Sequence, residues 1–459
     1  MQRTDFLPGI FLPEERFAAY GPDDLPLIEL FYFDAGGGHR SAATALKAAI
    51  EQAVREERFP PCRAEMVNLQ DMLENVDRIH RATQKIRSIK MQLFKNHPAE
   101  EAKKFRAEDV YNTALKHGWT FLADSLLRGL YWGIAHYGEE MAPVLEGHFR
   151  STRPGMVVSV IPNFNHIADP ALQAVLPGTP YVTIPTDLSD LLPKKAGKKQ
   201  PFWLAMNRDQ YVINGTPELH AQAMATGFYE PDHVIQVDGM ILKPGFYRDD
   251  FADREETLRK LGLDPGKKTT LITFGGHGSA ASIGIAKRLE RSGLPLQNIV
   301  ICGRNEKLFN RMKALEENGV LKSTKVFGFV DMPLFMHVAD VVIGKPGPGI
   351  ISEAIHMGCA ILTTRNAFTM PQELPNTYLV EKWGVGIAMP GFWQVATAMQ
   401  RLFGNNRLEQ CQRNARAIEI RALHQIPGKL AKILRKHLMG IGSRPSSVVS
   451  PSAYGDLRA

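Results

Sequence analysis

The chain contains the same local pattern twice: an apolar run, a glycine-rich turn and then an amphipathic stretch. The first copy, LIELFYFDAGGGHRSAATAL, covers residues 27–46, and the second, TTLITFGGHGSAASIGIAKRL, covers residues 269–289. Glycine costs backbone entropy, so repeated glycines at such a turn indicate either a tight bend or a ligand held against bare backbone. Each copy therefore predicts a strand, a glycine loop and a helix.

Each copy also opens a series of alternating strands and helices. The first predicts a strand over 27–34 and a helix over 41–57, with Ser41 as its N-cap. Two such series, about 240 residues apart in a chain of 459, favour an α/β fold of two Rossmann-like domains that face each other across a cleft. The other strands predicted from short apolar runs are 155–162, 180–187, 210–215, 298–303, 325–330, 340–345 and 360–364.

Local composition suggests where the domains begin and end. The stretch VDGMILKPGF, residues 237–246, carries two glycines and a proline between the two series, and we expect the hinge there. The stretch GKLAKILRKHLMG, residues 428–440, has the pattern of a basic amphipathic helix. The predicted divisions are 1–25 as an extension, 26–240 as the N-terminal domain, 241–425 as the C-terminal domain, 426–441 as the basic helix and 442–459 as a disordered tail.

The bulk composition narrows the class of protein and its partners. The formal net charge of +7 favours anionic partners, and no stretch approaches the roughly 18 uninterrupted apolar residues of a membrane-spanning helix. Cys62, Cys302, Cys359 and Cys411 show neither metal-binding nor disulfide spacing, so we expect reduced thiols. Without a signal-peptide pattern or a nucleic-acid-binding module, the sequence predicts a cytoplasmic protein that does not bind nucleic acid.

The motif with the most chemical content is KPGPG, residues 345–349. It predicts a stiff turn with bare backbone, followed by a helix that begins at about Ile350 with its first amides unpaired, which is a site for an anion. Glu353, expected on the first turn of that helix, could accept hydrogen bonds from the two hydroxyls of a ribose. Gln372 and Glu373 follow a proline turn, and an adjacent amide and acid suit a sugar ring with several hydroxyls.

Six segments, in their order and spacing, resemble the inverting GT-B glycosyltransferases of the monogalactosyldiacylglycerol synthase and processive diacylglycerol glucosyltransferase group. These segments are DAGGGHRSAA, GGHGS, ICGRN, FGFV, KPGPGIISEAIHMGCAIL and PQELPN, within roughly residues 27–425. The peptidoglycan N-acetylglucosaminyl transferases are similar but more distant. The resemblance implies an enzyme that transfers a hexose from a UDP-sugar to a lipid hydroxyl, diacylglycerol in particular, with inversion.

The resemblance also implies the roles of particular residues. The catalytic base falls on His39, because the glycine loop that ends there holds the base in the family. Independently of the resemblance, Asp187 in IPTDL, at the end of a predicted strand that faces the cleft, could orient the base or the acceptor. No Asp-x-Asp triplet occurs, so we expect a metal-independent site without a cofactor. The implied UDP-sugar-binding residues are Gly36, Gly37, Gly38, Gly276, His277, Gly278, Ser279, Arg304, Phe329, Val330, Lys345, Gly347, Pro348, Gly349, Ile350, Glu353, Gln372, Glu373 and Asn376. The implied acceptor-binding residues are Asn165, His166 and Trp203.

Several alternatives remain open from the sequence. The same donor chemistry could serve a soluble acceptor. The weak fingerprint Gly276-x-Gly278-x-x-Ala281 could instead indicate an NAD(P)-dependent oxidoreductase, and a non-catalytic sensor of sugar nucleotides is a further possibility. The basic stretches KKAGKK, residues 194–199, and 428–440 are either solvated faces or the seat of a peripheral contact with an anionic membrane, on its inner face.

Overall fold

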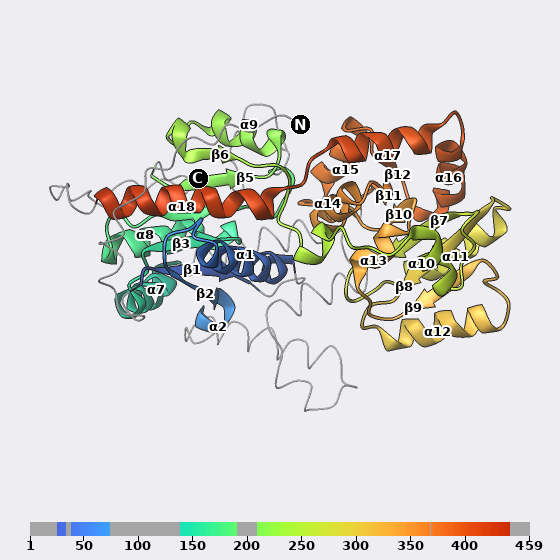
Figure 1. Ribbon diagram of the computed structural model, residues 1–459, viewed down its shortest axis with the longest axis horizontal. Coiled ribbons are helices and arrows are strands. Elements are labelled where there is room, and N and C mark those ends of the chain that lie inside the picture. The colour runs from blue at the N-terminus through green and yellow to red at the C-terminus, as the bar shows by residue number, and fades with distance from the viewer. Residues whose placement is uncertain (1–24, 34–37, 74–137, 191–208, 368, 441–459) are drawn as a thin grey trace.

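The computed structural model describes residues 25–33, 38–73, 138–190, 209–367 and 369–440 (Figure 1). These residues form two α/β halves, and each half is built on one six-stranded parallel sheet. The strands are short and almost wholly buried in the middle of each sheet, which is typical of parallel sheets with helices on both faces. The prediction of two Rossmann-like domains is confirmed.

The N-terminal sheet has the strand order β2-β1-β3-β4-β5-β6. Its strands are β1 Leu27–Tyr32, β2 Arg63–Asn68, β3 Met156–Ser159, β4 Tyr181–Thr183, β5 Tyr211–Asn214 and β6 Val234–Gln236. Its helices are α1 Gly38–Arg55, α2 Leu69–Leu73, α7 Gly138–Thr152, α8 Asn165–Val175 and α9 Pro217–Thr226, with short 3-10 turns η3 Pro162–Phe164 and η4 Pro231–His233.

The C-terminal sheet has the strand order β12-β11-β10-β7-β8-β9. Its strands are β7 Lys268–Thr273, β8 Leu296–Ile301, β9 Thr324–Phe327, β10 Val341–Ile343, β11 Ala360–Thr364 and β12 Gly386–Met389. Its helices are α10 Arg254–Lys260, α11 Ala281–Arg291, α12 Glu306–Glu317, α13 Met332–His337, α14 Pro348–His356, α15 Leu374–Lys382, α16 Val395–Phe403 and α17 Arg407–Ala417, with 3-10 turns η5 Pro244–Tyr247 and η6 Phe392–Gln394.

Each sheet has one point where the strand order reverses. In the N-terminal sheet the chain goes from β1 outward to β2 and then returns to β3 on the other side of β1; in the C-terminal sheet β7 and β10 stand in the same relation. Loops that leave neighbouring strands in opposite directions open a crevice at the carboxyl ends of the strands, where ligands bind in such folds. The glycine-rich turns GGHGS and KPGPG follow β7 and β10, and Gly38 and His39 follow β1, so these described residues lie at the two points.

The last helix, α18 Ala422–Gly440, packs on the N-terminal domain (Figure 1). Its buried side chains, among them Leu430 and Leu434, share one apolar core with α1 and with strands of the N-terminal sheet. The predicted start of this helix at residue 426 is wrong, because the helix already begins at Ala422. Its apolar face is thereby covered, and Lys432 and Lys436 lie on its exposed face.

The chain crosses between the domains twice, and the two crossings pack together. The first crossing coincides with the predicted hinge at 237–246, and the second precedes α18. Gly239 has a φ of 76°, and a Cβ there would lie 2.4 Å from the Cδ1 atom of Ile420. The Asp238 carbonyl accepts from the backbone N–H groups of Arg421 at 2.6 Å and Ala422 at 2.9 Å. Only glycine therefore permits this approach of the two linkers.

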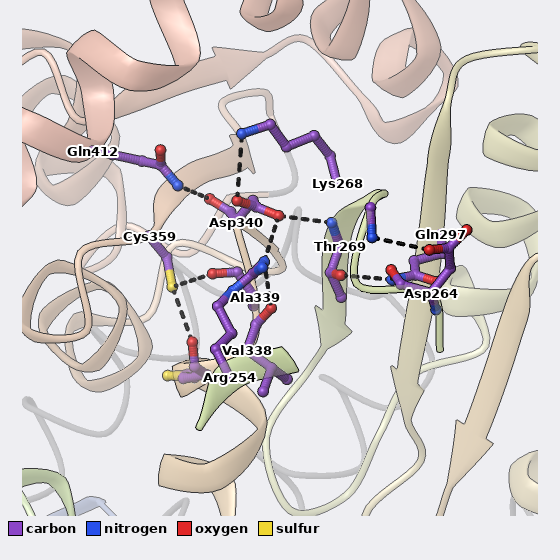
Figure 2. A network of polar contacts seen from close by, with 12 residues as sticks. Arg254, Asp264, Lys268, Thr269, Gln297, Val338, Ala339, Asp340, Cys359 and Gln412 are labelled. Carbon is purple, nitrogen blue, oxygen red and sulfur yellow. Dashed lines mark hydrogen bonds and ion pairs between the residues drawn. The ribbon is translucent and has the colours of Figure 1, made fainter. Parts of the chain in front are cut away.

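Figure 2 shows a polar network around Asp340, which is 8% exposed and directly precedes β10. Its carboxylate accepts from the Thr269 backbone N–H at 2.8 Å and from Arg254 at 2.9 Å. The Sγ atom of Cys359, next to it, lies 3.4 Å from the Ala339 carbonyl. These groups lie at the amino ends of the strands, opposite the glycine loops, so the network holds the C-terminal domain together.

Some sequence-based expectations need correction. Helix α1 begins at Gly38, so Ser41 lies inside the helix and is not its N-cap. The strands β2, β6 and β12 were not predicted, and all three are edge strands with partly exposed side chains. The cysteines are free, as expected. Among the described residues, no helix combines the length and the apolar character needed to span a bilayer.

Candidate functional site

His39 lies at the reversal point of the N-terminal sheet, on the first turn of α1. Its ring Nδ1 is 2.9 Å from the carbonyl oxygen of Val160, directly after β3, and 3.0 Å from the Thr186 hydroxyl, after β4. Burial lowers the pKa of His39 below its usual 6.5, and the bond to Val160 opposes this only in part. The imidazole is therefore neutral near neutral pH, as a general base must be.

Three consecutive residues after β4 connect the surroundings of His39 to the C-terminal domain. Thr186 contacts His39, and Leu188 is 2% exposed within the core of the C-terminal domain. Between them, the pKa of Asp187 is raised to about 7, first by burial and then by the negative charges of Glu373 and Asp190. Asp187 thus faces Glu373 across the two domains, and no hydrogen bond joins it to His39.

The loop after β7, GGHGS, contains glycines of two kinds. A Cβ at Gly278, whose φ is 59°, would lie 2.5 Å from the Cys302 carbonyl oxygen, so this glycine serves the packing of one loop on another. A Cβ at Gly276 would meet only the Arg304 side chain, at 3.7 Å. The Gly276 carbonyl accepts from the backbone of Arg304, and the His277 carbonyl accepts from Asn305. The loop is fixed from behind while the backbone around Gly276 stays accessible.

An exposed aromatic ring lies beside this loop. Phe329, after β9, is 62% exposed, and the guanidinium carbon of Arg304 lies 4.2 Å from its ring centroid. Val330 next to it is half-buried against the core. A flat ring held by a cation offers a stacking surface for a planar base, as predicted for the uracil.

The KPGPG turn leads directly into α14, which begins at Pro348. Gly347 is its N-cap and has no side chain, so it makes no cap hydrogen bond to the first amides of the helix. A Cβ at Gly349 would meet nothing within 4 Å, so the backbone there is open. This end of α14 carries the partial positive charge that favours an anion.

Glu353 does not lie on the first turn of α14, contrary to the prediction. Because the helix begins two residues earlier than expected, Glu353 falls on its second turn. The helix dipole stabilises acidic side chains only in the first turn, so it does not account for an acid at this position. Burial raises the pKa of Glu353 to about 7, against the opposing charge of Lys243 in the linker. A carboxyl group kept at this cost, without a hydrogen bond to any side chain in the described part of the chain, is a candidate for binding a ligand.

The start of α15 is tied to the KPGPG turn. Lys345 donates to the Glu373 carboxylate at 2.7 Å, and Glu373 is only 7% exposed. Asn376 is fully buried and donates to the Pro346 carbonyl at 2.9 Å, while its Oδ1 has no hydrogen-bond partner. Gln372 directly precedes this cluster. Lys345, predicted to contact a diphosphate, is thus paired with the acid predicted to bind the sugar.

The residues predicted to bind the acceptor lie in different surroundings. Asn165 is 1% exposed, and its amide bonds to Thr183 at 2.7 Å and to the Tyr181 hydroxyl at 3.0 Å, so its polar atoms serve the core. His166 is exposed at the start of α8. Gly36, Gly37 and Trp203 lie outside the described residues, and Gly38 is the first residue of α1.

A side-chain contact holds the two domains together beside this site. Glu218, on α9, accepts from Lys382 and from the Trp383 indole N–H, each at 3.0 Å, at the end of α15. A cavity of about 450 Å³ lies between α9 and α15, lined among others by Ser189 and Tyr378. No sequence pattern predicted this contact, because a glutamate and a lysine far apart in the chain form no recognisable motif.

The sequence also did not single out Val160 and Thr186 as neighbours of His39. Thr186 stands in IPTDL beside Asp187, and that motif was the available signal. Val160 contributes a backbone carbonyl, which a sequence does not reveal. Within the described parts of the chain, no group of three or more His, Cys, Asp or Glu side chains could hold a metal ion.

The chain has two α/β domains, each with one parallel sheet and with a glycine-rich motif at the point where the strand order reverses. This architecture defines the class of fold, which is the GT-B glycosyltransferase fold. Residues 272–382 match the glycosyltransferase family 28 C-terminal domain. This range contains all the predicted donor-side loops, from GGHGS to PQELPN, and it does not contain His39. The resemblance stated from the sequence is thereby confirmed for the C-terminal half.

Relatives that match over two thirds or more of the chain are named as monogalactosyldiacylglycerol synthases. The chain is 28% identical over 326 residues to the probable monogalactosyldiacylglycerol synthase 3, chloroplastic, of Oryza sativa subsp. japonica, a match that covers 68% of this chain and 60% of the relative. It is 25% identical over 431 residues to monogalactosyldiacylglycerol synthase 1, chloroplastic, of Arabidopsis thaliana, covering 88% and 70%. The match thus spans about 60% of the rice relative.

Solved structures support the fold alone. The Acinetobacter baumannii MurG structure matches with a TM-score of 0.51 at 11% identity, covering 89% of this chain and 99% of that one. The S. aureus MnaA structure with UDP matches with a TM-score of 0.53 at 14% identity, covering 93% and 100%. Both agree with two facing α/β domains.

Proposed function

We propose that this protein transfers a hexose from a UDP-sugar to a lipid hydroxyl, diacylglycerol in particular, with inversion at the anomeric carbon and without a metal ion. The proposal is supported by a neutral, oriented imidazole that contacts Thr186, next to Asp187, whose pKa responds to the charge of Glu373 in the C-terminal domain. The family 28 match to the donor-side loops and the names of the relatives support the same reaction.

The proposed donor site lies on the C-terminal domain. The uracil stacks near Phe329 and Val330, and Glu353 accepts hydrogen bonds from the ribose. The diphosphate binds between the loop Gly276–Ser279 and the start of α14, where two sets of backbone amides stabilise its charge as UDP leaves. Arg304 and Lys345 are the cations nearest to these loops.

The hexose is proposed to lie against Gln372, Glu373 and Asn376. The buried Glu373 carboxylate and the unpartnered Asn376 Oδ1 can both accept from sugar hydroxyls. Lys345 pairs with Glu373 until the donor arrives, and it can then turn to the diphosphate. Asp187 approaches Glu373 from the N-terminal domain and closes this part of the site.

The proposed chemical step is one in-line displacement. His39 takes the proton of the acceptor hydroxyl as the oxygen attacks the anomeric carbon and the bond to the UDP oxygen breaks. The displacement inverts the configuration and gives a β-glycoside. The proton remains on the imidazole until solvent removes it, and the negative charge leaves with UDP.

The proposed acceptor and location follow from the relatives' names and from the surface charge. The exposed face of α18 carries Lys432 and Lys436, and Lys429 lies partly exposed one turn earlier. Each basic residue close to an anionic membrane contributes about 1 kcal/mol to binding. We therefore place the protein peripherally on an anionic membrane, with the acceptor drawn from the bilayer.

The test is incubation of the protein with a panel of UDP-hexoses and vesicles of phosphatidylglycerol that contain diacylglycerol. Mass spectrometry should detect a hexosyl-diacylglycerol with at least one donor, and the anomeric proton coupling should identify a β-glycoside. EDTA should leave the rate unchanged. The inactive control is His39→Ala.

Three outcomes would contradict separate parts of the proposal. Transfer only to water-soluble alcohols would overturn the lipid acceptor, and an α-glycoside would overturn inversion. Loss of activity in EDTA that Mg²⁺ restores would overturn metal independence. Reduction or oxidation of a nicotinamide cofactor, without any glycoside, would favour the oxidoreductase alternative.

A further inference from the structure

The ring nitrogen Nδ1 of His39 has two oxygen neighbours of different character. The Val160 oxygen, at 2.9 Å, belongs to a backbone carbonyl, which can only accept a hydrogen bond. The Thr186 oxygen, at 3.0 Å, belongs to a hydroxyl, which can donate or accept. A bare lone pair on Nδ1 would face the carbonyl lone pairs at 2.9 Å, so the hydrogen of the neutral ring belongs on Nδ1.

We infer that the Val160 carbonyl and the Thr186 hydroxyl hold His39 in the tautomer with hydrogen on Nδ1, so that Nε2 carries the lone pair. Thr186 is then a positioning residue, and its oxygen acts as the second acceptor of a shared Nδ1–H. Nε2 makes no hydrogen bond with any residue that the structure describes. The inference rests on the proposed function only where it assigns Nε2 the proton of the acceptor hydroxyl.

The fold explains why these three groups meet. His39 follows β1, Val160 follows β3 and Thr186 follows β4, and these three strands are neighbours in the sheet. The His39 ring and the oxygen atoms of Val160 and Thr186 therefore lie close together at the carboxyl ends of these strands. Both acceptors are neutral, so they orient the ring without the strong stabilisation of an imidazolium that a carboxylate partner would give.

This assignment replaces the predicted role of Asp187. The negative charges of Glu373 and Asp190 act on the carboxyl group of Asp187, which makes no hydrogen bond to the His39 ring. Thr186 and Asp187 are adjacent in IPTDL, but Thr186 contacts His39 in the N-terminal domain, whereas Asp187 interacts with Glu373 in the C-terminal domain. Loss of the Asp187 charge should therefore leave the His39 tautomer as it is.

The test is a nitrogen NMR spectrum of the full chain labelled with ¹⁵N-histidine, without substrate, at pH 7.5. The His39 signals are identified by their absence in His39→Gln. We expect a protonated Nδ1 and an unprotonated Nε2 for His39, in the wild type and in Asp187→Asn alike. A protonated Nε2 in the wild type would overturn the inference, whatever reaction the protein catalyses.

Two variants test Thr186 itself. Thr186→Val keeps the shape and removes the oxygen, whereas Thr186→Ser keeps the oxygen. Loss of one hydrogen bond corresponds to about a three- to tenfold fall in kcat, with the KM for the UDP-sugar unchanged. Thr186→Ser should restore the rate and the wild-type spectrum. Equal rates and spectra in both variants would overturn the role of Thr186, while a wild type without glycosyl transfer would count against the proposed function alone.

Discussion

Glu353→Gln should stabilise the unliganded protein at pH 8 and leave its stability nearly unchanged at pH 4. Burial raises the pKa of Glu353 from its usual 4.5 to about 7. Between these two values the unfolded chain loses this proton while the folded protein keeps it, so the free energy of unfolding falls as pH rises. Above pH 7 the folded protein must ionise a buried carboxyl group, and the difference in pKa corresponds to at most about 3 kcal/mol.

The same group should link UDP binding to pH. If Glu353 accepts from the ribose hydroxyls, UDP binds the ionised form, and binding below pH 7 must release a proton. The UDP affinity of the wild type should then fall by about tenfold for each pH unit below 7. The Gln variant should bind UDP more weakly at pH 8, and its affinity should follow only the titration of UDP itself.

Urea denaturation, followed by far-UV circular dichroism at pH 4 and pH 8, measures the stability of both proteins. Isothermal titration calorimetry with UDP, in buffers of different ionisation enthalpy, measures affinity and proton release. The ratio of the two affinities at each pH cancels the titration of UDP. A Gln variant that is less stable than the wild type at pH 8 would contradict the raised pKa of Glu353. A ratio of affinities that does not change with pH would contradict its binding to the ribose.

Three further predictions concern the base, the domain contact and the fold. His39→Ala should lower kcat by about 100-fold or more while UDP affinity in calorimetry stays within about twofold; near-normal turnover would remove His39 as the base. Glu218→Ala should free Lys382 and enlarge the radius of gyration of the unliganded protein in small-angle scattering, whereas an unchanged radius would mean that this contact does not hold the domains. Asp340→Ala removes one acceptor of Arg254 and leaves the buried Thr269 backbone N–H unsatisfied (Figure 2), so the free energy of unfolding should fall by about 2 kcal/mol. UDP affinity should not change in that variant, because the network lies at the far ends of the strands.

The sequence predicted the central strands and the glycine loops well, for a physical reason. Strands such as β7 and β10 are buried on both faces and therefore read as short apolar runs. The edge strand β2, with the sequence RAEMVN, has exposed and half-exposed positions and carries no such signal. Local patterns thus located the two reversal points but not the full width of either sheet.

The candidate site was predictable where a motif carried it. KPGPG, GGHGS and the glycine–histidine loop were found as local patterns, and the structure places KPGPG, GGHGS and His39 at the carboxyl ends of the strands. The contacts of His39 with Val160 and Thr186 join residues 121 and 147 positions apart in the chain. The error at Glu353 came from the exact start of α14, since a shift of two residues moves a side chain from the first turn to the second.

The central claim is that one domain holds the UDP-sugar and the other presents the base to it. The most direct measurement is a crystal structure with an unreactive UDP-hexose bound. We predict that the diphosphate lies between Gly276–Ser279 and Gly347–Ile350, and that the anomeric carbon faces His39 with room for one acceptor hydroxyl. A donor bound outside these loops would contradict the proposed donor site. An anomeric carbon directed away from His39 would contradict the role of His39 as the base.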